Sequence, residues 1–203
     1  MKHISAVARL FTCLCVVAVV VACAKPYRLN VAYQTPQAPG EVSVGSVVLT
    51  VTDKRGNMDI FSESARKEFD QWDGTFALVQ KDAPDAKPVV ANDLAALFEN
   101  ALEKRLNAMG IDVVEGTIDD APLFSVSLLS FRLNLDKRTW KSDITFAASL
   151  TRDQQNIASE KVSAQAERTK VMGKGAGEQL IGELFTESIN QLNIEKLFEK
   201  AGM

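Results

Sequence analysis

The longest stretch with helical periodicity lies near the middle of the chain, over residues 92–109. Its apolar residues recur at steps of three and four, which places them on one side of a helix. Asn92 is a favourable N-cap, Asp93 suits the positive end of the helix dipole, and Gly110 is placed to end the helix. The pattern therefore predicts an amphipathic helix whose buried stripe contains Leu94, Leu97, Phe98, Ala101, Leu102, Leu106 and Met109.

Segments rich in β-branched residues precede and follow this helix. VGSVVLTVTD, residues 44–53, ends at a cluster of turn-forming residues, and a short apolar segment, residues 111–114, follows Gly110 directly. A strand, a helix and a second strand in this order predict a crossover between parallel neighbours.

Alternation of apolar and polar residues dominates the next region and predicts an antiparallel meander of three strands. The first strand, residues 124–135, changes phase at Leu128 and Leu129, which indicates a β-bulge. After a turn at 136–138, residues 140–151 alternate regularly, so one face is apolar and the other is wet. Residues 157–168 return as a polar strand near an edge of the sheet.

A second helical stripe closes the chain, and Asn193 is placed to cap a last short helix. The stripe contains Leu180, Ile181, Leu184, Phe185, Ile189 and Leu192. Together these elements predict an α+β two-layer sandwich, in which two amphipathic helices cover one face of a mixed sheet of four to six strands. We expect a single domain over residues 45–203.

Two segments lack a sustained period. Residues 23–44 contain Pro26, Pro36 and Pro39, and we interpret them as an extended tether. Residues 57–90 are interpreted as an irregular insertion. It holds four large aromatic residues, which either fold back onto the core or form a partner-binding patch: Phe61, Phe69, Trp72 and Phe76.

The N-terminus has the layout of a secretory signal, with basic residues first and then an apolar run of residues 10–22. The run is shorter than the roughly 20 residues of a membrane-spanning helix. Val20-Val21-Ala22-Cys23 resembles the bacterial lipobox, although valine replaces the commoner leucine at its first position. This resemblance implies removal of residues 1–22 and lipid attachment at Cys23, whose acyl chains supply stable anchoring. An ordinary signal peptide that is cleaved elsewhere is the alternative.

Processing at Cys23 changes what chemistry the chain can perform. The remaining 203 − 22 = 181 residues carry 21 Lys and Arg against 26 Asp and Glu, a net charge of −5. An acidic chain is a poor match for nucleic acid. The only histidine, His3, and two of the three cysteines leave with the signal peptide, which excludes Ser-His-Asp and Cys-His catalysis and most zinc sites. We expect no catalytic residues, metal or cofactor.

Three weaker candidate sites each have a plainer structural interpretation. The glycine-rich segment 173–177 precedes a helix as phosphate-binding loops do, but it lacks their residue spacing, so a flexible connection is favoured. Asp119-Asp120, with Asp112 and Glu115, could offer oxygen ligands to a cation, but solvated loop acids are favoured. The predicted hairpin tip, residues 137–141, could touch anionic lipid headgroups, although a solvated turn is favoured.

The whole pattern resembles the YajG-type bacterial lipoproteins. The resemblance rests on the segments Cys23-Ala24-Lys25-Pro26, VVLTVTDKR, LAALFENALEKRLNAMG, WKSDITFAASLT and EQLIGELFTESINQLNIEKLF, and it covers nearly all of the mature chain except residues 57–90. It implies a lipid-anchored periplasmic domain without assigned enzymatic activity. Ala24 after the lipidated cysteine implies sorting to the outer membrane rather than the inner membrane.

The resulting hypothesis is a non-enzymatic accessory or adapter lipoprotein that binds an envelope protein. A carrier of lipid or glycan, with a groove between helices and sheet, is the alternative. A hydrolase that uses carboxylates is the third possibility. The layout also resembles auxiliary lipoproteins of envelope transport systems.

Overall fold

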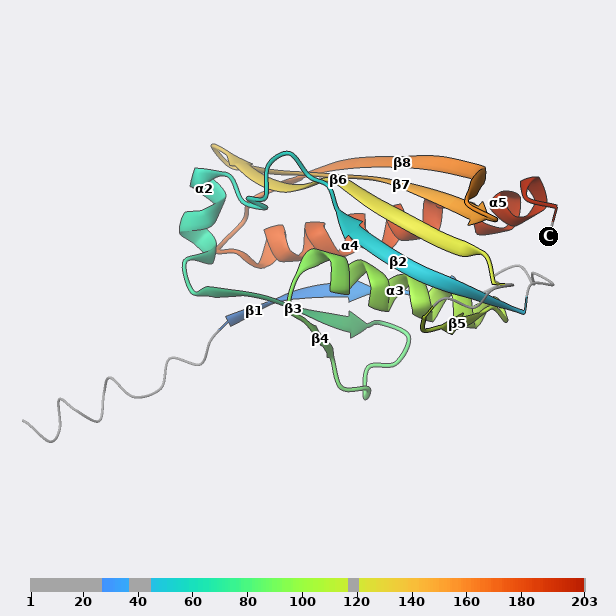
Figure 1. Cartoon of the computed structure of the whole chain (residues 1–203). Coiled ribbons are helices and arrows are strands. Elements are labelled where there is room, and N and C mark those ends of the chain that lie inside the picture. Colours follow the sequence, from blue (N-terminus) through green and yellow to red (C-terminus); the bar gives the residue numbers. More distant parts are fainter. Residues whose placement is uncertain (1–26, 37–44, 117–120, 203) are drawn as a thin grey trace, which may run out of the picture.

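A computed structural model describes residues 27–36, 45–116 and 121–202. These residues form two sheets and a set of helices (Figure 1). The five-stranded sheet has the order β5-β2-β6-β7-β8 and the three-stranded sheet has the order β1-β3-β4. The elements are β1 Tyr27–Tyr33, β2 Ser46–Asp53, α2 Glu63–Arg66, the 3-10 turn η1 Lys67–Phe69, β3 Trp72–Gln80, β4 Val89–Ala91, α3 Leu94–Ala108, β5 Asp112–Val114, β6 Leu123–Asp136, β7 Thr139–Arg152, β8 Gln155–Thr169, α4 Gly175–Gln191 and α5 Ile194–Lys200.

The five-stranded sheet confirms most of the predicted connections. Strand β2 runs parallel to its neighbours β5 and β6, and β6, β7 and β8 form the predicted antiparallel meander. The register between β6 and β7 shifts between Leu128 and Ser130. Leu129 is therefore the extra residue of a β-bulge, and its side chain is 39% exposed while Leu128 is buried.

The three-stranded sheet corrects two predictions. Residues 27–33 are not part of a tether, because they form strand β1 and bury Leu29, Val31 and Tyr33 completely. Residues 57–90 are not an irregular insertion, because they contain α2, β3 and part of β4. The two segments pair with each other, since β1 lies parallel to β3. A second sheet thus joins the predicted mixed one, and the α+β sandwich is otherwise as expected.

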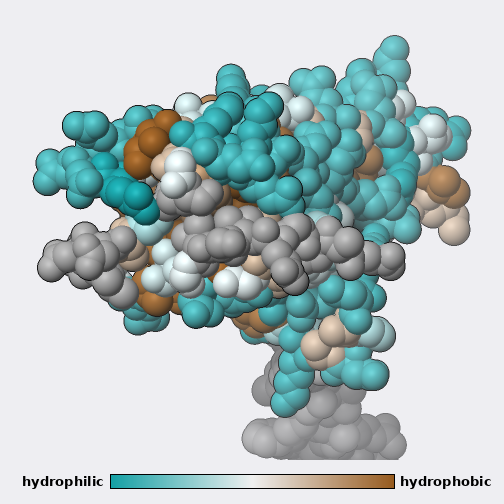
Figure 2. Space-filling view, turned by 90° about the vertical axis from the view of Figure 1, so that its right-hand side faces the viewer, coloured by the Kyte–Doolittle hydropathy of each residue, from teal (hydrophilic) through white to brown (hydrophobic). Residues whose placement is uncertain are grey.

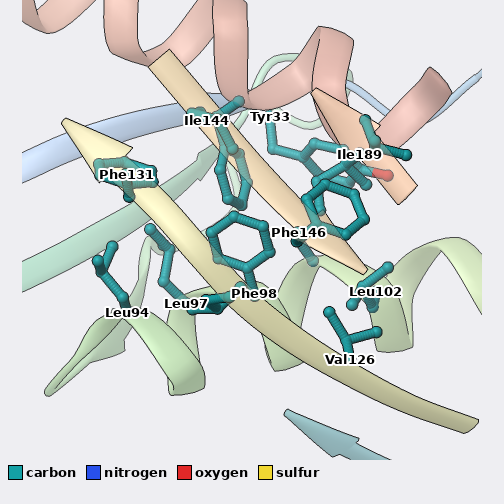
Figure 3. Packing of buried hydrophobic residues seen from close by; sticks show 14 of the residues in the cluster. Tyr33, Leu94, Leu97, Phe98, Leu102, Val126, Phe131, Ile144, Phe146 and Ile189 are labelled. Carbon is teal, nitrogen blue, oxygen red and sulfur yellow. The ribbon is translucent and has the colours of Figure 1, made fainter. Parts of the chain in front are cut away.

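Helices α3 and α4 lie between the two sheets (Figure 1). Asp93 rather than Asn92 caps α3, since its side chain accepts a hydrogen bond from the amide of Ala96 at 2.8 Å. Phe98 of α3 lies at the centre of the core, where its ring contacts those of Phe131, Phe146 and Phe185 at centroid distances of 5.0–6.2 Å (Figure 3). These edge-to-face contacts join both helices to strands β6 and β7.

The free edge of β1 is covered by α4. The helix presents a row of residues at four-residue spacing along this edge: Glu178, Gly182, Thr186 and Asn190. The Glu178 carboxylate accepts a hydrogen bond from the backbone amide of Asn30 at 2.7 Å. Thr186 and Asn190 donate to the backbone carbonyls of residues 32 and 34 at 3.1 and 3.0 Å. Side chains of a helix thus satisfy backbone groups that a neighbouring strand would otherwise pair.

The four aromatic residues of segment 57–90 fold back onto the core, as the plainer of the two interpretations expected. Phe61 stacks on Phe69 with a centroid distance of 4.6 Å, and Trp72 meets both Phe61 and Phe76 edge to face. Phe69 also contacts Trp140 of β7. The cluster therefore fills the space between the two sheets and leaves no aromatic patch for a partner in this segment.

Candidate functional site

Several residues that the sequence singled out lie outside the described ranges. They are His3, Cys13, Cys15, Cys23, Asp119 and Asp120. Within residues 27–36, 45–116 and 121–202, no group of three metal-binding side chains comes together. No described helix is long and apolar enough to cross a membrane.

The glycine-rich segment 173–177 serves helix packing. Lys174 is the N-cap of α4, so Gly175 and Gly177 already belong to the helix. A Cβ atom at Gly177 would lie 3.0 Å from the ring of Trp140, so the ring would have to shift to admit a side chain there. The Lys174 ammonium group lies 3.2 Å from the centroid of the Tyr27 ring, a cation–π contact.

The predicted basic and aromatic hairpin tip is divided by the fold. Trp140 is fully buried, so it takes no part in a surface site. Lys141 lies on the opposite face of β7 and forms ion pairs with Asp136 and Glu167 at 3.4 and 3.7 Å. Lys137 and Arg138 remain at the turn and are exposed.

The wet side of the meander carries polar side chains along all three of its strands. We call it the outer face: the side of β6–β8 that points away from α3 and α4 (Figure 1). Residues that pair across β6, β7 and β8 form rows on this face. Near the β7–β8 turn the rows are Ser125, Ser149, Ser159; Ser127, Ala147, Lys161; and Ser130, Thr145, Ser163. Near the β6–β7 turn they are Arg132, Asp143, Gln165; and Asn134, Lys141, Glu167.

The charged half of the outer face forms a shallow groove. A space of about 460 Å³ lies between Arg132, Asn134, Lys141, Asp143, Gln165 and Glu167. The Ser130 hydroxyl donates a hydrogen bond to the Asp143 carboxylate. Because both signs of charge occur side by side, this groove suits a polar, charge-bearing protein segment more than a uniformly charged ligand.

Strand β8 ends the five-stranded sheet on one side, as the sequence predicted for residues 157–168. Its 15 residues make it a long edge strand, and edge strands can recruit a strand from another protein. The outer face and the β8 edge are continuous, so one partner can contact both.

A second groove lies at the other edge of the five-stranded sheet, where α3 faces the short edge strand β5. It encloses about 740 Å³ and is lined by β2, β5 and the acidic side chains Glu99, Glu103 and Glu115. The predicted groove between the helices and the sheet is therefore displaced to the sheet edge, because aromatic side chains fill the space between α3, α4 and β7. Asp112 is not among its lining residues.

Two carboxyl groups have a pKa held below its ordinary value. Arg55 lowers the pKa of Asp53 through hydrogen bonds, with Nε at 2.9 Å from Oδ1 and Nη2 at 2.8 Å from Oδ2. The hydroxyl and amide of Thr75 lower the pKa of Asp73. A carboxyl group that acts as a general acid at neutral pH needs a raised pKa. The lowered pKa values of Asp53 and Asp73 therefore do not suit that role.

Comparisons with known proteins give structural similarity only. No protein-family profile and no curated sequence matches the chain. Among solved structures, protein XCC0632 from Xanthomonas campestris aligns over 87% of this chain and 95% of its own, with 15% identity and a TM-score of 0.49. A minor lipoprotein from Acinetobacter baumannii aligns over 79% and 93%, with 12% identity and a TM-score of 0.38.

A third similar structure, a putative lipoprotein from Caulobacter crescentus, aligns over 54% of this chain and 84% of its own. Its identity is 9% and its TM-score is 0.39. The similar structures thus include bacterial lipoproteins, but at these scores the likeness carries no argument about function. Membership of the YajG-type family stays a prediction.

Proposed function

We propose that this chain is a non-enzymatic accessory lipoprotein of the bacterial envelope, which holds a protein partner on the outer face of its five-stranded sheet. The observation that carries the proposal is the contrast between the two faces of that sheet. One face buries its side chains against α3 and α4, while the other presents rows of serine, threonine and mixed charges. Small side chains leave a flat surface that a partner's strand or helix can approach closely.

The anchor in this proposal is Cys23, acylated after removal of residues 1–22. The lipobox-like sequence supports it, and Ala24 supports sorting to the outer membrane with the domain facing the periplasm. The mature chain then has no histidine and no free thiol, which supports a binding role rather than catalysis.

Site-specific crosslinking of the full lipidated chain in its own envelope tests the adapter role. A photoreactive amino acid replaces Ser149 or Gln165 on the outer face, and Lys200 on α5 serves as the matched exposed control. We expect one discrete crosslinked product of the same partner from both outer-face positions and none from position 200. Equal products from all three positions, or none from the outer face, would overturn the proposal.

Charge reversal supplies the second test of this surface. Asp143→Lys places a cation beside Arg132 in the groove and should reduce the crosslink at Gln165 severalfold. Asp85→Lys, an exposed change in the β3–β4 connection, should leave it unchanged. Equal unfolding midpoints for both variants would show that the loss is one of binding.

A carrier role is the second candidate, because the 740 Å³ groove beside α3 is large enough for a small glycan. Its lining combines valine and leucine residues of β2 and β5 with Glu99, Asn100 and Glu103, whose side chains suit sugar hydroxyls and disfavour anionic headgroups. Native mass spectrometry of the gently purified protein separates the two roles. A stoichiometric adduct of glycan mass that Glu103→Ala abolishes would favour the carrier, and a bare protein mass would favour the adapter.

A further inference from the structure

The loop between β8 and α4 presents two apolar side chains to solvent. Val171 is 78% exposed and Met172 is 84% exposed, more than any other large apolar residue of the described chain. Neither side chain helps to hold the fold, because Lys170 and Lys174 on either side make the contacts that fix the loop. Contiguous exposed apolar side chains can mark a contact surface for a protein partner or a membrane.

This loop lies at the end of the molecule where the described chain begins. Lys174 lies over the ring of Tyr27, the first residue of β1, and the amide of Lys170 donates a hydrogen bond to the carbonyl of Arg138 at 2.7 Å. Figure 1 shows the β6–β7 turn, the β8–α4 loop and the start of β1 at the same end. We call residues 27, 137–138 and 170–174 the anchor end.

The short distance along the chain from Cys23 to Tyr27 limits how far the anchor end can lie from a membrane that holds a lipid on Cys23. Four residues span at most about 14 Å when fully extended. Because β1 begins at Tyr27 and is fixed in the three-stranded sheet, a lipid on Cys23 would hold the anchor end within that reach of the bilayer surface. A tether as long as residues 23–44 would have left the domain free to lie far from the membrane.

We propose that Val171 and Met172 insert into the bilayer interface and that the anchor end of the domain rests on the membrane. The inference rests on the proposed lipid anchor at Cys23. The exposed Lys137 and Arg138 lie at the same end, and within the described chain neither forms an ion pair. They suit anionic phospholipid headgroups beside the inserted apolar side chains.

The opposite end of the molecule provides the contrast. Figure 2 views that end, where hydrophilic residues make up most of the described surface. Ile157, at the start of β8, is 38% exposed. It lies 12 residues before Thr169, the last residue of the same strand, or roughly 40 Å away at about 3.3 Å per residue. A bilayer that contacts Met172 therefore leaves Ile157 in water.

The test uses the full lipidated chain in vesicles of phosphatidylethanolamine and phosphatidylglycerol. Because Cys23 is acylated and Cys13 and Cys15 leave with the signal peptide, Met172→Cys supplies a single reactive thiol for an environment-sensitive fluorophore. Ile157→Cys is the matched control. We expect a blue-shifted emission that spin-labelled lipid quenches at position 172, and water-like emission at position 157. Adding Val171→Asp should reduce the shift at position 172.

Flotation of the vesicles distinguishes a failure of the proposed insertion from a failure of the proposed lipid anchor. Protein that floats with the vesicles but gives water-like emission at position 172 would overturn the inference and leave the anchor intact. Protein that does not float would overturn the lipid anchor, and the inference with it. Equal blue shifts at positions 172 and 157 would also overturn the proposed orientation.

Discussion

Gly182 of α4 and Ala32 of β1 approach each other so closely that no side chain fits between them. A Cβ atom at Gly182 would lie 2.9 Å from the backbone nitrogen of Ala32 and 3.1 Å from its Cβ. Because the obstacle is backbone, it cannot move aside as the end of a flexible side chain can. This close contact lets α4 cover the edge of β1 with Glu178, Thr186 and Asn190 on either side of the glycine.

Gly182→Ala should therefore lower the stability of the protein. Alanine in a helix interior is ordinarily favoured over glycine by about 1 kcal/mol. Here we expect a net loss of about 1–3 kcal/mol, the usual cost of overpacking a filled interior. Urea unfolding measures the change, and Gly175→Ala in the same helix is the matched control because a Cβ at that position meets nothing within 4 Å. A Gly182→Ala protein as stable as the control would contradict the close contact.

The contact between α4 and β1 was not predictable from the sequence. The stripe of Leu180, Ile181, Leu184 and Phe185 was visible, since apolar residues at helical spacing need no partner to be recognised. The row of α4 that begins at Glu178 is polar, and nothing in the sequence indicates which element it contacts. Its partner is β1, and the prolines around residues 27–33 had suggested a tether instead.

Strand β1 did carry a period-two signal, because Leu29, Val31 and Tyr33 alternate with polar or small residues. The signal is short, and the strand that confirms it, β3, lies more than 40 residues further along the chain. Strand β3 also contains Gly74 with a φ of 93°, an unusual residue within a strand. By contrast, the meander pairs strands that are adjacent in sequence, so local alternation was sufficient to predict it.

Of the two candidate surfaces, the sequence predicts the outer face of the sheet but not the exposed loop between β8 and α4. The wet face of β7 followed directly from alternation along residues 140–151. The exposure of Val171 and Met172 did not, since apolar residues are ordinarily assigned to a core. Only the fold shows that they lie outside it and close to the start of β1.

Tyr33 should make stability depend on pH in the alkaline range. Burial raises the pKa of its phenol to about 12, although the positive charge of Arg105 opposes the shift. Its folded pKa exceeds the unfolded value near 10, so the stabilisation is complete below pH 10 and is lost as the pH rises through 12. Two pKa units correspond to about 2.7 kcal/mol.

Urea unfolding at pH 9 and pH 11.5 measures this loss, with Tyr33→Phe as the control. We expect the variant to lose less stability than the original chain over that interval. It should still lose some, because burial also raises the pKa of Tyr27, the other tyrosine. An identical loss in both proteins would mean that the Tyr33 phenol ionises as freely in the folded state as in the unfolded chain.

Deletion of Leu129 tests the bulge in β6. Leu128 pairs with Phe146 and Ser130 pairs with Thr145, so removing the residue between them leaves both pairs in the register of an ordinary antiparallel ladder. Phe131 and Leu133 then keep their place in the core. We expect a folded protein whose free energy of unfolding changes by at most about 1–2 kcal/mol, because the bulge shapes the local twist more than it supplies contacts.

Deletion of Thr145 in β7 is the matched change. It removes a residue from the strand opposite the bulge, so β6 would have two extra residues facing β7, and the alternation of either Ile144 or Phe146 would be reversed. Circular dichroism and urea unfolding should show a folded chain without Leu129 and a largely unfolded chain without Thr145. If both deletions unfolded the protein equally, Leu129 would be a fixed part of the ladder rather than its one extra residue.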